Sequence, residues 1–124
     1  MTYDDSNIFA RILRGEIPAD IVRETAHTLA FNDIAPQAPV HVLVIPKGAY
    51  VTFDDFAARA GADEILDFVR TAGELSAALG VSPLAGGQGF RAIANAGPHS
   101  GQEVPHFHLH LLGGRGLGRL VEPA

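Results

Sequence analysis

The sequence contains no cysteine, and Lys47 is its only lysine. Without a thiol the chain can form no disulfide, and it has neither a cysteine nucleophile nor a cysteine-ligated zinc site. No apolar run approaches the length of about 18 residues that spans a bilayer. The first residues are acidic rather than basic. We therefore expect no membrane span, no signal peptide and a cytoplasmic protein.

The chain also has little positive charge. Fourteen acidic residues stand against nine basic ones, for a formal net charge of −5, and the basic residues do not cluster. A protein that binds a nucleic-acid polymer usually carries a basic stripe that displaces counterions. We therefore expect no polymeric nucleic acid as partner, and a phosphate ester would have to be bound locally by backbone N–H groups and imidazoles.

The 124 residues, of which 47% are apolar, are enough for one domain, residues 1–124, with a core of its own. Apolar periodicity predicts a short helix over residues 7–14, with Ser6 as N-cap and Gly15 as the stop, and a long helix over 61–79. Strand patterns cover residues 21–24, 28–32, 40–45, 90–95 and a segment from 103 or 105 to 112. Because strands and helices do not alternate, we predict an antiparallel α+β fold.

Three of the six histidines lie within five residues, as His106, His108 and His110. They alternate with Phe107 and Leu109, which is the period of a β-strand, so the imidazoles share one face and the apolar side chains the other. Neighbouring imidazoles are then rooted about 6.6 Å apart. Burying three imidazoles without function is costly, because each ring has two nitrogens that need partners. The pattern therefore indicates a row of groups that handle one anionic or metal-bound substrate.

The segment from Asn95 to Arg115 resembles the signature of the histidine triad (HIT) superfamily, in which histidines alternate with apolar residues. The Gly-Gly-Arg at residues 113–115 is similar to that of the Hint branch, the purine nucleoside phosphoramidases. Similar upstream segments are residues 8–9, 15–19, 30–34, 36–39 and 41–47. The resemblance therefore covers most of the chain.

The resemblance implies a five-stranded antiparallel sheet with one short N-terminal helix and one long helix. It also implies a homodimer in which two sheets join into one of ten strands. The expected activity is hydrolysis of purine nucleoside 5′-monophosphate derivatives, namely phosphoramidates and acyl-nucleotides, through a covalent nucleotidyl-histidine and without metal or cofactor. The 61–79 helix supports a dimer, since its apolar residues exceed what one sheet face needs to cover.

By the same resemblance His108 is the nucleophile, and the backbone carbonyl of His106 fixes its tautomer. His106 and His110 would flank the phosphate, with His110, helped by His41, donating the proton to the leaving amine. A neutral imidazole can attack phosphorus, and the imidazolium that results leaves readily when water arrives.

The resemblance further assigns substrate-binding roles. The phosphate would be met by the Asn95 amide and by backbone N–H groups of Gly101, Gln102, Glu103 and Val104. Asp33 would accept bonds from both ribose hydroxyls, or serve only as a turn residue before the proline loop. The purine would enter an apolar slot whose residues could equally be plain core: Ile8, Phe9, Ile12, Phe31 and Ile34.

Three other readings stay open. A dinucleoside polyphosphate hydrolase of the Fhit branch is disfavoured by Gly-Gly-Arg where a proline would directly follow the triad. A zinc enzyme could use His-x-His on a strand, although alternating histidines converge poorly on one ion. A nucleotide-binding regulatory module would act through its surface rather than by turnover. The sequence leaves open the leaving group and the choice between adenine and guanine.

Overall fold

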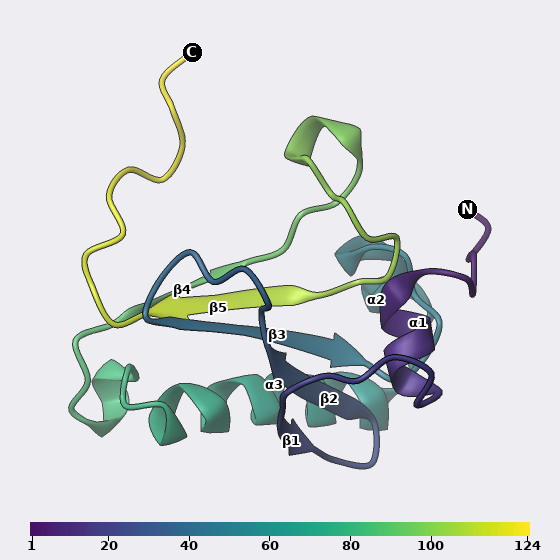
Figure 1. The fold of residues 1–124 in the computed structure, drawn as a ribbon, viewed down its shortest axis with the longest axis horizontal. Coiled ribbons are helices and arrows are strands. Elements are labelled where there is room, and N and C mark those ends of the chain that lie inside the picture. The colour runs from purple at the N-terminus through teal and green to yellow at the C-terminus, as the bar shows by residue number, and fades with distance from the viewer.

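A computed structural model describes all residues from 1 to 124. Its centre is an antiparallel sheet of five strands in the order β1-β2-β3-β5-β4 (Figure 1). The strands are β1 (Ile21–Glu24), β2 (Thr28–Asn32), β3 (Val40–Pro46), β4 (Phe90–Ile93) and β5 (Leu109–Gly113). The predicted α+β class is confirmed, and β4 and β1 are the two edges of the sheet.

Three α-helices accompany the sheet: α1 (Ile8–Leu13), α2 (Phe53–Arg59) and α3 (Ala62–Ala78). The predicted N-cap of α1 was wrong by one residue, because the Asn7 side chain, not Ser6, accepts from the Ala10 N–H. Helix α2 was not predicted at all. It begins after Thr52, whose hydroxyl accepts from the Asp55 N–H, and its short apolar face carries Phe56 into the core.

The sheet has a hydrophobic cluster on each face. On one face, side chains of β2, β3 and β5 pack with Phe56 of α2 and with Phe68 and Leu75 of α3. On the opposite face, Phe9 of α1 packs with side chains of β2 and β3. The short N-terminal helix therefore closes one side of the sheet, while the long helix supports the other (Figure 1).

The histidine segment is a strand only in its second half. Pairing with β3 begins at Leu109, opposite Val44, so the prediction of a strand from residue 103 or 105 was wrong. Pro105 lacks an N–H, and the Phe107 N–H donates to the Tyr50 carbonyl instead of to a neighbouring strand. The alternation of faces is nevertheless confirmed, because Phe107 packs in the cluster below α2 and α3, whereas His106 and His108 lie against Phe9.

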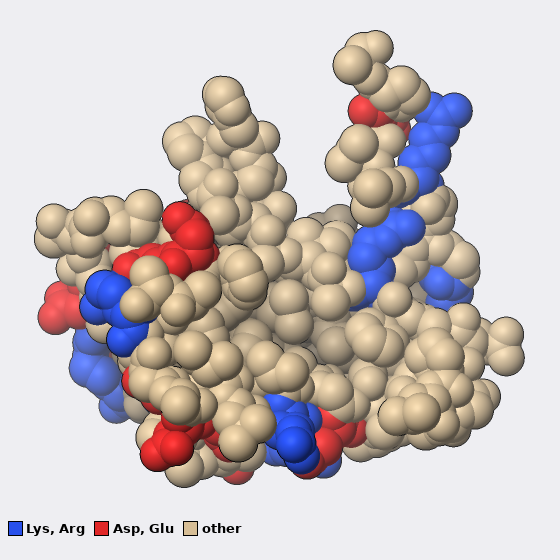
Figure 2. Space-filling model, turned by 180° about the vertical axis from the view of Figure 1, so that it is seen from behind, with Lys and Arg blue, Asp and Glu red and all other residues tan.

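None of the helices combines the length and the apolar character needed to cross a bilayer. Charged side chains of both signs are scattered over the face shown in Figure 2, and much of that face is uncharged. The positively charged side chains on this face include a narrow line that runs up the projecting segment at the upper right, and separate smaller groups elsewhere.

Candidate active site

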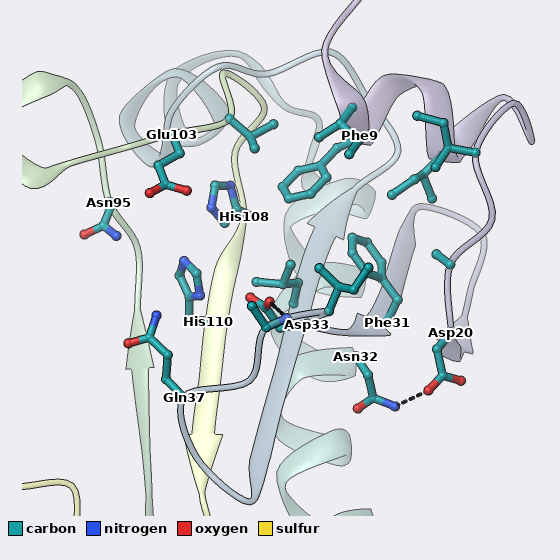
Figure 3. Close-up of a pocket in the computed structure, with 18 of the residues that line it drawn as sticks. Phe9, Asp20, Phe31, Asn32, Asp33, Gln37, Asn95, Glu103, His108 and His110 are labelled. Carbon is teal, nitrogen blue, oxygen red and sulfur yellow. Dashed lines mark hydrogen bonds between the residues drawn. The ribbon is translucent and has the colours of Figure 1, made fainter.

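A cavity of about 1030 Å³ opens beside α1 and is lined by 20 residues. His108 and His110 lie at one end, near Asn95 and Glu103 (Figure 3). Asp20 and Asn32, joined by a hydrogen bond of 2.8 Å, lie at the other end. Phe9 and Phe31 stand between the two ends, so the cavity has a polar head, an apolar middle and a polar far edge.

The ring of His108 is held in one orientation and one tautomer. Its Nδ1 lies 2.7 Å from the carbonyl oxygen of His106, and because a carbonyl only accepts, Nδ1 carries the proton. Phe9 packs against the ring edge-to-face, with centroids 5.0 Å apart. Burial lowers the pKa of His108, so the ring is neutral at pH 7. Its Nε2 is left with a free lone pair at the cavity.

A second chain of hydrogen bonds orients His110. The Gln37 N–H donates to Nδ1 of the buried His41, at 3.0 Å, so Nε2 of His41 carries the proton. That Nε2 lies 2.9 Å from Nδ1 of His110 and donates to it. His110 therefore carries its own proton on Nε2, toward the cavity. Burial lowers the pKa of His110 to about 4, with a further lowering from His108 and His41.

Asp33, His41 and His110 each offer a metal-ligand atom, and these three atoms all lie within 4.8 Å of one another. The hydrogen bonds argue against that use. A metal on Nε2 of His41 needs a lone pair there, but the Gln37 N–H already takes the lone pair of Nδ1, which leaves the proton on Nε2. The cluster therefore fits a proton-bearing network better than an ion.

His106 lies behind the cavity rather than in it. It is fully buried and is absent from the cavity lining. Nε2 lies 2.8 Å from the Pro46 carbonyl and Nδ1 lies 2.6 Å from the Tyr3 hydroxyl, so neither ring nitrogen is available to a phosphate. Burial lowers its pKa to about 4. This placement does not support the expectation that its ring flanks the phosphate. The backbone carbonyl of His106 does make the expected contact, because it accepts from Nδ1 of His108.

The glycine loop supplies fewer donors than the sequence suggested. The N–H groups of Gly101 and Gln102 donate within their own turn, to Pro98 and Gly97. The Gln102 side chain braces the loop through Gly97, Val51 and Val104 and does not line the cavity. The N–H groups of Glu103 and Val104 have no acceptor in the chain, and both residues line the cavity. The backbone N–H groups of Glu103 and Val104, together with the side-chain amide of Asn95, therefore remain as candidate hydrogen-bond donors to a bound anion.

The five apolar residues predicted for the base slot all line the cavity. Phe9 and Phe31 are also core residues, whereas Ile34 is fully exposed at its rim. Asp33 makes a turn contact and also lines the cavity. One carboxylate oxygen accepts from the Ala35 N–H at 2.8 Å, as in a turn, and the other lies 3.3 Å from Nε2 of His41 at the cavity.

Sequence reasoning missed part of the lining, because small or polar residues without a motif carry no functional signal, and Ile17 and Leu43 are indistinguishable from core residues in the sequence. The added residues come from the connection before β1, the end of β2, the proline loop and β3: Ile17, Pro18, Ala19, Asp20, Asn32, Ala35, Gln37 and Leu43. Tyr3, which holds His106 from outside the cavity, was also missed.

Comparison with known proteins gives consistent matches along most of the chain. The sequence profile of the HIT domain matches residues 14–117. The chain is 54% identical over 120 residues to an uncharacterized HIT-like protein of Azospirillum brasilense, covering 97% of this chain and 95% of that one. It is 40% identical over 118 residues to the purine nucleoside phosphoramidase of Escherichia coli, covering 94% of each. The structure of a HIT family hydrolase from Clostridium thermocellum aligns with a TM-score of 0.83 at 34% identity, covering 96% and 99% of the two chains.

The buried neutral histidines predict an acid-sensitive fold. The pKa of His106 is about 4 in the folded chain, against about 6.5 for an exposed histidine. The unfolded chain therefore binds more protons, and the free energy of unfolding falls as the pH drops from about 6.5 to about 4. His106 contributes up to about 1.4 kcal/mol per pH unit, and His110 less, because it is better solvated.

Urea unfolding at several pH values between about 7 and 5 measures this slope. The variant His99→Gln is the control, since His99 is exposed and its loss should leave the slope unchanged. A free energy of unfolding that stays flat across this range would contradict the neutral, buried assignment of the two histidines.

Proposed function

The chain belongs to the HIT family, and on that basis we propose that it hydrolyses purine nucleoside 5′-phosphoramidates and related acyl-nucleotides. The observation that carries the proposal is the complementary pair of imidazoles at the head of the cavity. His108 presents a bare Nε2 and His110 presents an Nε2–H, with ring centroids 5.0 Å apart. A nucleophile and a donor thus face the same small space.

In the first step Nε2 of His108 attacks phosphorus, and the bond from phosphorus to the leaving nitrogen breaks as that nitrogen gains a proton. When substrate binds, the phosphate's negative charge raises the pKa of His110, because an opposite charge favours imidazolium, and the ring takes up one proton from solvent. The added proton lies on Nδ1 of His110, and the Nε2–H of His41 then donates to the Asp33 carboxylate, 3.3 Å away, instead. His110 then gives its Nε2 proton to the departing amine. In the second step water attacks phosphorus, His110 takes a proton back, and His108 leaves as a neutral ring. The His106 carbonyl stabilises the positive charge on His108 between the two steps.

The charge of the cavity favours a phosphoramidate over a dinucleoside polyphosphate. Its lining includes the carboxylates Asp20, Asp33 and Glu103, and no lysine or arginine. A phosphoramidate has a single negative charge on phosphorus, whereas a polyphosphate bridge has one on every phosphate and usually needs cationic partners. The same carboxylates suit an amine as the leaving group.

The apolar middle of the cavity suits a purine. Phe9 and Phe31 lie edge-to-face, with centroids 5.5 Å apart, and Ile8, Ile12 and Ile34 add aliphatic surface. Asp33 lies between this slot and the histidines (Figure 3). This location supports the proposal that Asp33 accepts from the ribose hydroxyls of a substrate whose phosphorus lies beside His108.

We also propose that the active protein is a homodimer. Helix α3 has a second apolar stripe that faces away from the core, with Leu66 and Val69 more than half exposed. Gly73 continues this stripe and has no neighbouring atom within 4 Å of where a Cβ would be, so another helix could approach closely. Strand β4 leaves one edge of the sheet unpaired. A second copy covering both features would give an interface on the order of 2,000 Å².

Removing the nucleophile should abolish turnover and spare binding. We expect His108→Ala to hydrolyse adenosine 5′-phosphoramidate at no detectable rate while binding AMP within a few-fold of the unmodified protein, because the ribose and base contacts reside on other residues. Steady-state kinetics and calorimetry measure the two quantities, with His99→Ala as the exposed control. A His108→Ala variant with more than a few per cent of the activity would remove this residue from the mechanism.

Asp33 is tested by discrimination between sugars. We expect Asp33→Asn to weaken ribonucleotide binding by roughly 1 to 3 kcal/mol and to erase the preference for ribo- over 2′-deoxynucleotides. Asp20→Asn is the matched control, since it changes a carboxylate at the opposite end of the same cavity. If the ratio of ribo to deoxy affinity stays the same in Asp33→Asn, this residue serves the turn alone.

The dimer is tested at its exposed apolar stripe. We expect Val69→Asp to yield monomers in sedimentation experiments at micromolar concentration, because it places a charge in the interface. Ala57→Asp is the control, since Ala57 is an exposed helical residue on α2. A monomeric unmodified protein that retains full activity at that concentration would exclude the dimer.

A further inference from the structure

Tyr3 lies before the residues matched by the HIT domain profile and outside the cavity, yet it touches the catalytic segment. Its hydroxyl lies 2.6 Å from Nδ1 of His106, and the two rings meet edge-on with centroids 5.6 Å apart. The only other tyrosine, Tyr50, bonds Glu64 on the opposite side of the sheet. The contact is therefore a specific feature of the N-terminal segment.

The direction of this hydrogen bond follows from the other partners of His106. The Pro46 carbonyl can only accept, so Nε2 of His106 donates to it and carries the ring proton. Nδ1 is then a bare acceptor, and the Tyr3 O–H is the donor. No other group in the chain bonds Nδ1, and no water can reach a fully buried ring without a rearrangement.

The backbone around His106 has few other supports. Sheet pairing starts three residues later, at Leu109, and in this stretch the Phe107 N–H bond to Tyr50 is the nearest backbone anchor. The position of the His106 carbonyl therefore depends on how its side chain is held. That carbonyl is the acceptor that sets the tautomer and direction of His108.

Tyr3 itself is firmly placed. The turn that follows it is closed by bonds from Ser6 and Asn7 to Asp4, and Asn7 caps α1. The Arg14 guanidinium, at the end of the same helix, donates to the Asp5 carbonyl. The segment that carries Tyr3 is thus tied to α1, whose Phe9 packs on both His106 and His108.

We propose that Tyr3 is a positioning residue for catalysis, acting on the nucleophile through the ring and then the carbonyl of His106. The inference rests on the proposed role of His108. It adds that the N-terminal segment, which lies outside the residues matched by the HIT domain profile, contributes to the active site. A donor lost at Tyr3 leaves Nδ1 of the buried His106 ring without a partner, so the ring is held by the Pro46 carbonyl alone and can shift, and the backbone carbonyl that His108 bonds can shift with it.

The test is Tyr3→Phe, which removes one oxygen and keeps the ring, with Tyr50→Phe as the matched control. For Tyr3→Phe we expect kcat for adenosine 5′-phosphoramidate to fall by roughly five- to tenfold or more, the worth of about one neutral hydrogen bond. The affinity for AMP should stay within twofold, because Tyr3 does not line the cavity. Tyr50→Phe should lower thermal stability without this selective loss in kcat.

A second measurement needs no turnover. In ¹⁵N-labelled protein the histidine ring nitrogens report their tautomers directly. We expect Tyr3→Phe to shift the Nδ1 resonance of His106 toward that of an unbonded nitrogen and to perturb the ring of His108, whereas Tyr50→Phe shifts neither. An unchanged His106 resonance would overturn the hydrogen bond, and a shifted resonance with unchanged kcat would overturn the positioning role.

An equal loss of kcat and of AMP affinity would also overturn the proposal, because it would indicate a general disturbance. These outcomes are distinct from failure of the proposed function. If His108→Ala remains active, the proposed chemistry fails whatever Tyr3→Phe does. If His108→Ala is inactive and Tyr3→Phe has full kcat, only the role of Tyr3 is wrong.

Discussion

The hydrogen bond between Nδ1 of His108 and the His106 carbonyl is the contact on which the chemistry of this site depends. A free imidazole exchanges its proton between two nitrogens and titrates near neutral pH. Here a backbone acceptor places the proton on the far nitrogen, and burial keeps the ring neutral. The near nitrogen is therefore a permanent lone pair aimed at the cavity. Some neighbouring groups hold the His106 residue in place, and others orient the ring of His110, which lies beside that of His108.

The other histidines follow the same principle with different partners. His106 has its proton set by the Pro46 carbonyl of β3, and His41 has its proton set by the Gln37 N–H. Each ring is assigned one tautomer by a backbone group, and no buried side-chain nitrogen or oxygen lacks a partner. A backbone group has no rotamers of its own, so it fixes a proton more reliably than a mobile side chain does. Backbone hydrogen bonds, and not charged side chains, therefore determine which ring nitrogen carries the proton.

The sequence predicted to which face each side chain of the histidine segment points, but not how deeply each side chain is buried. Alternation correctly separates His106 and His108 from Phe107, because side chains alternate even where the strand has not yet paired. It cannot show that His106 is sealed behind the cavity, since that depends on Tyr3, about a hundred residues earlier in the chain. The five apolar slot residues were recognisable only through family resemblance. Helix α2 was missed because seven residues give barely two turns of periodicity, although Thr52 and Asp55 carried a capping signal.

The Gly-Gly-Arg sequence after the histidines has a physical reason that the resemblance alone did not supply. Gly114 has a φ of +92°, and a Cβ there would lie 2.8 Å from the Pro39 side chain, so only glycine lets the proline loop approach this closely. The next residue, Arg115, donates to the Gln37 carbonyl at 2.7 Å. Together they fix the loop whose Gln37 N–H sets the tautomer of His41, and His41 in turn sets that of His110. The motif therefore orients His110, the proposed proton donor, from the far end of β5, as the N-terminal segment contacts His106, and through it His108, at the near end.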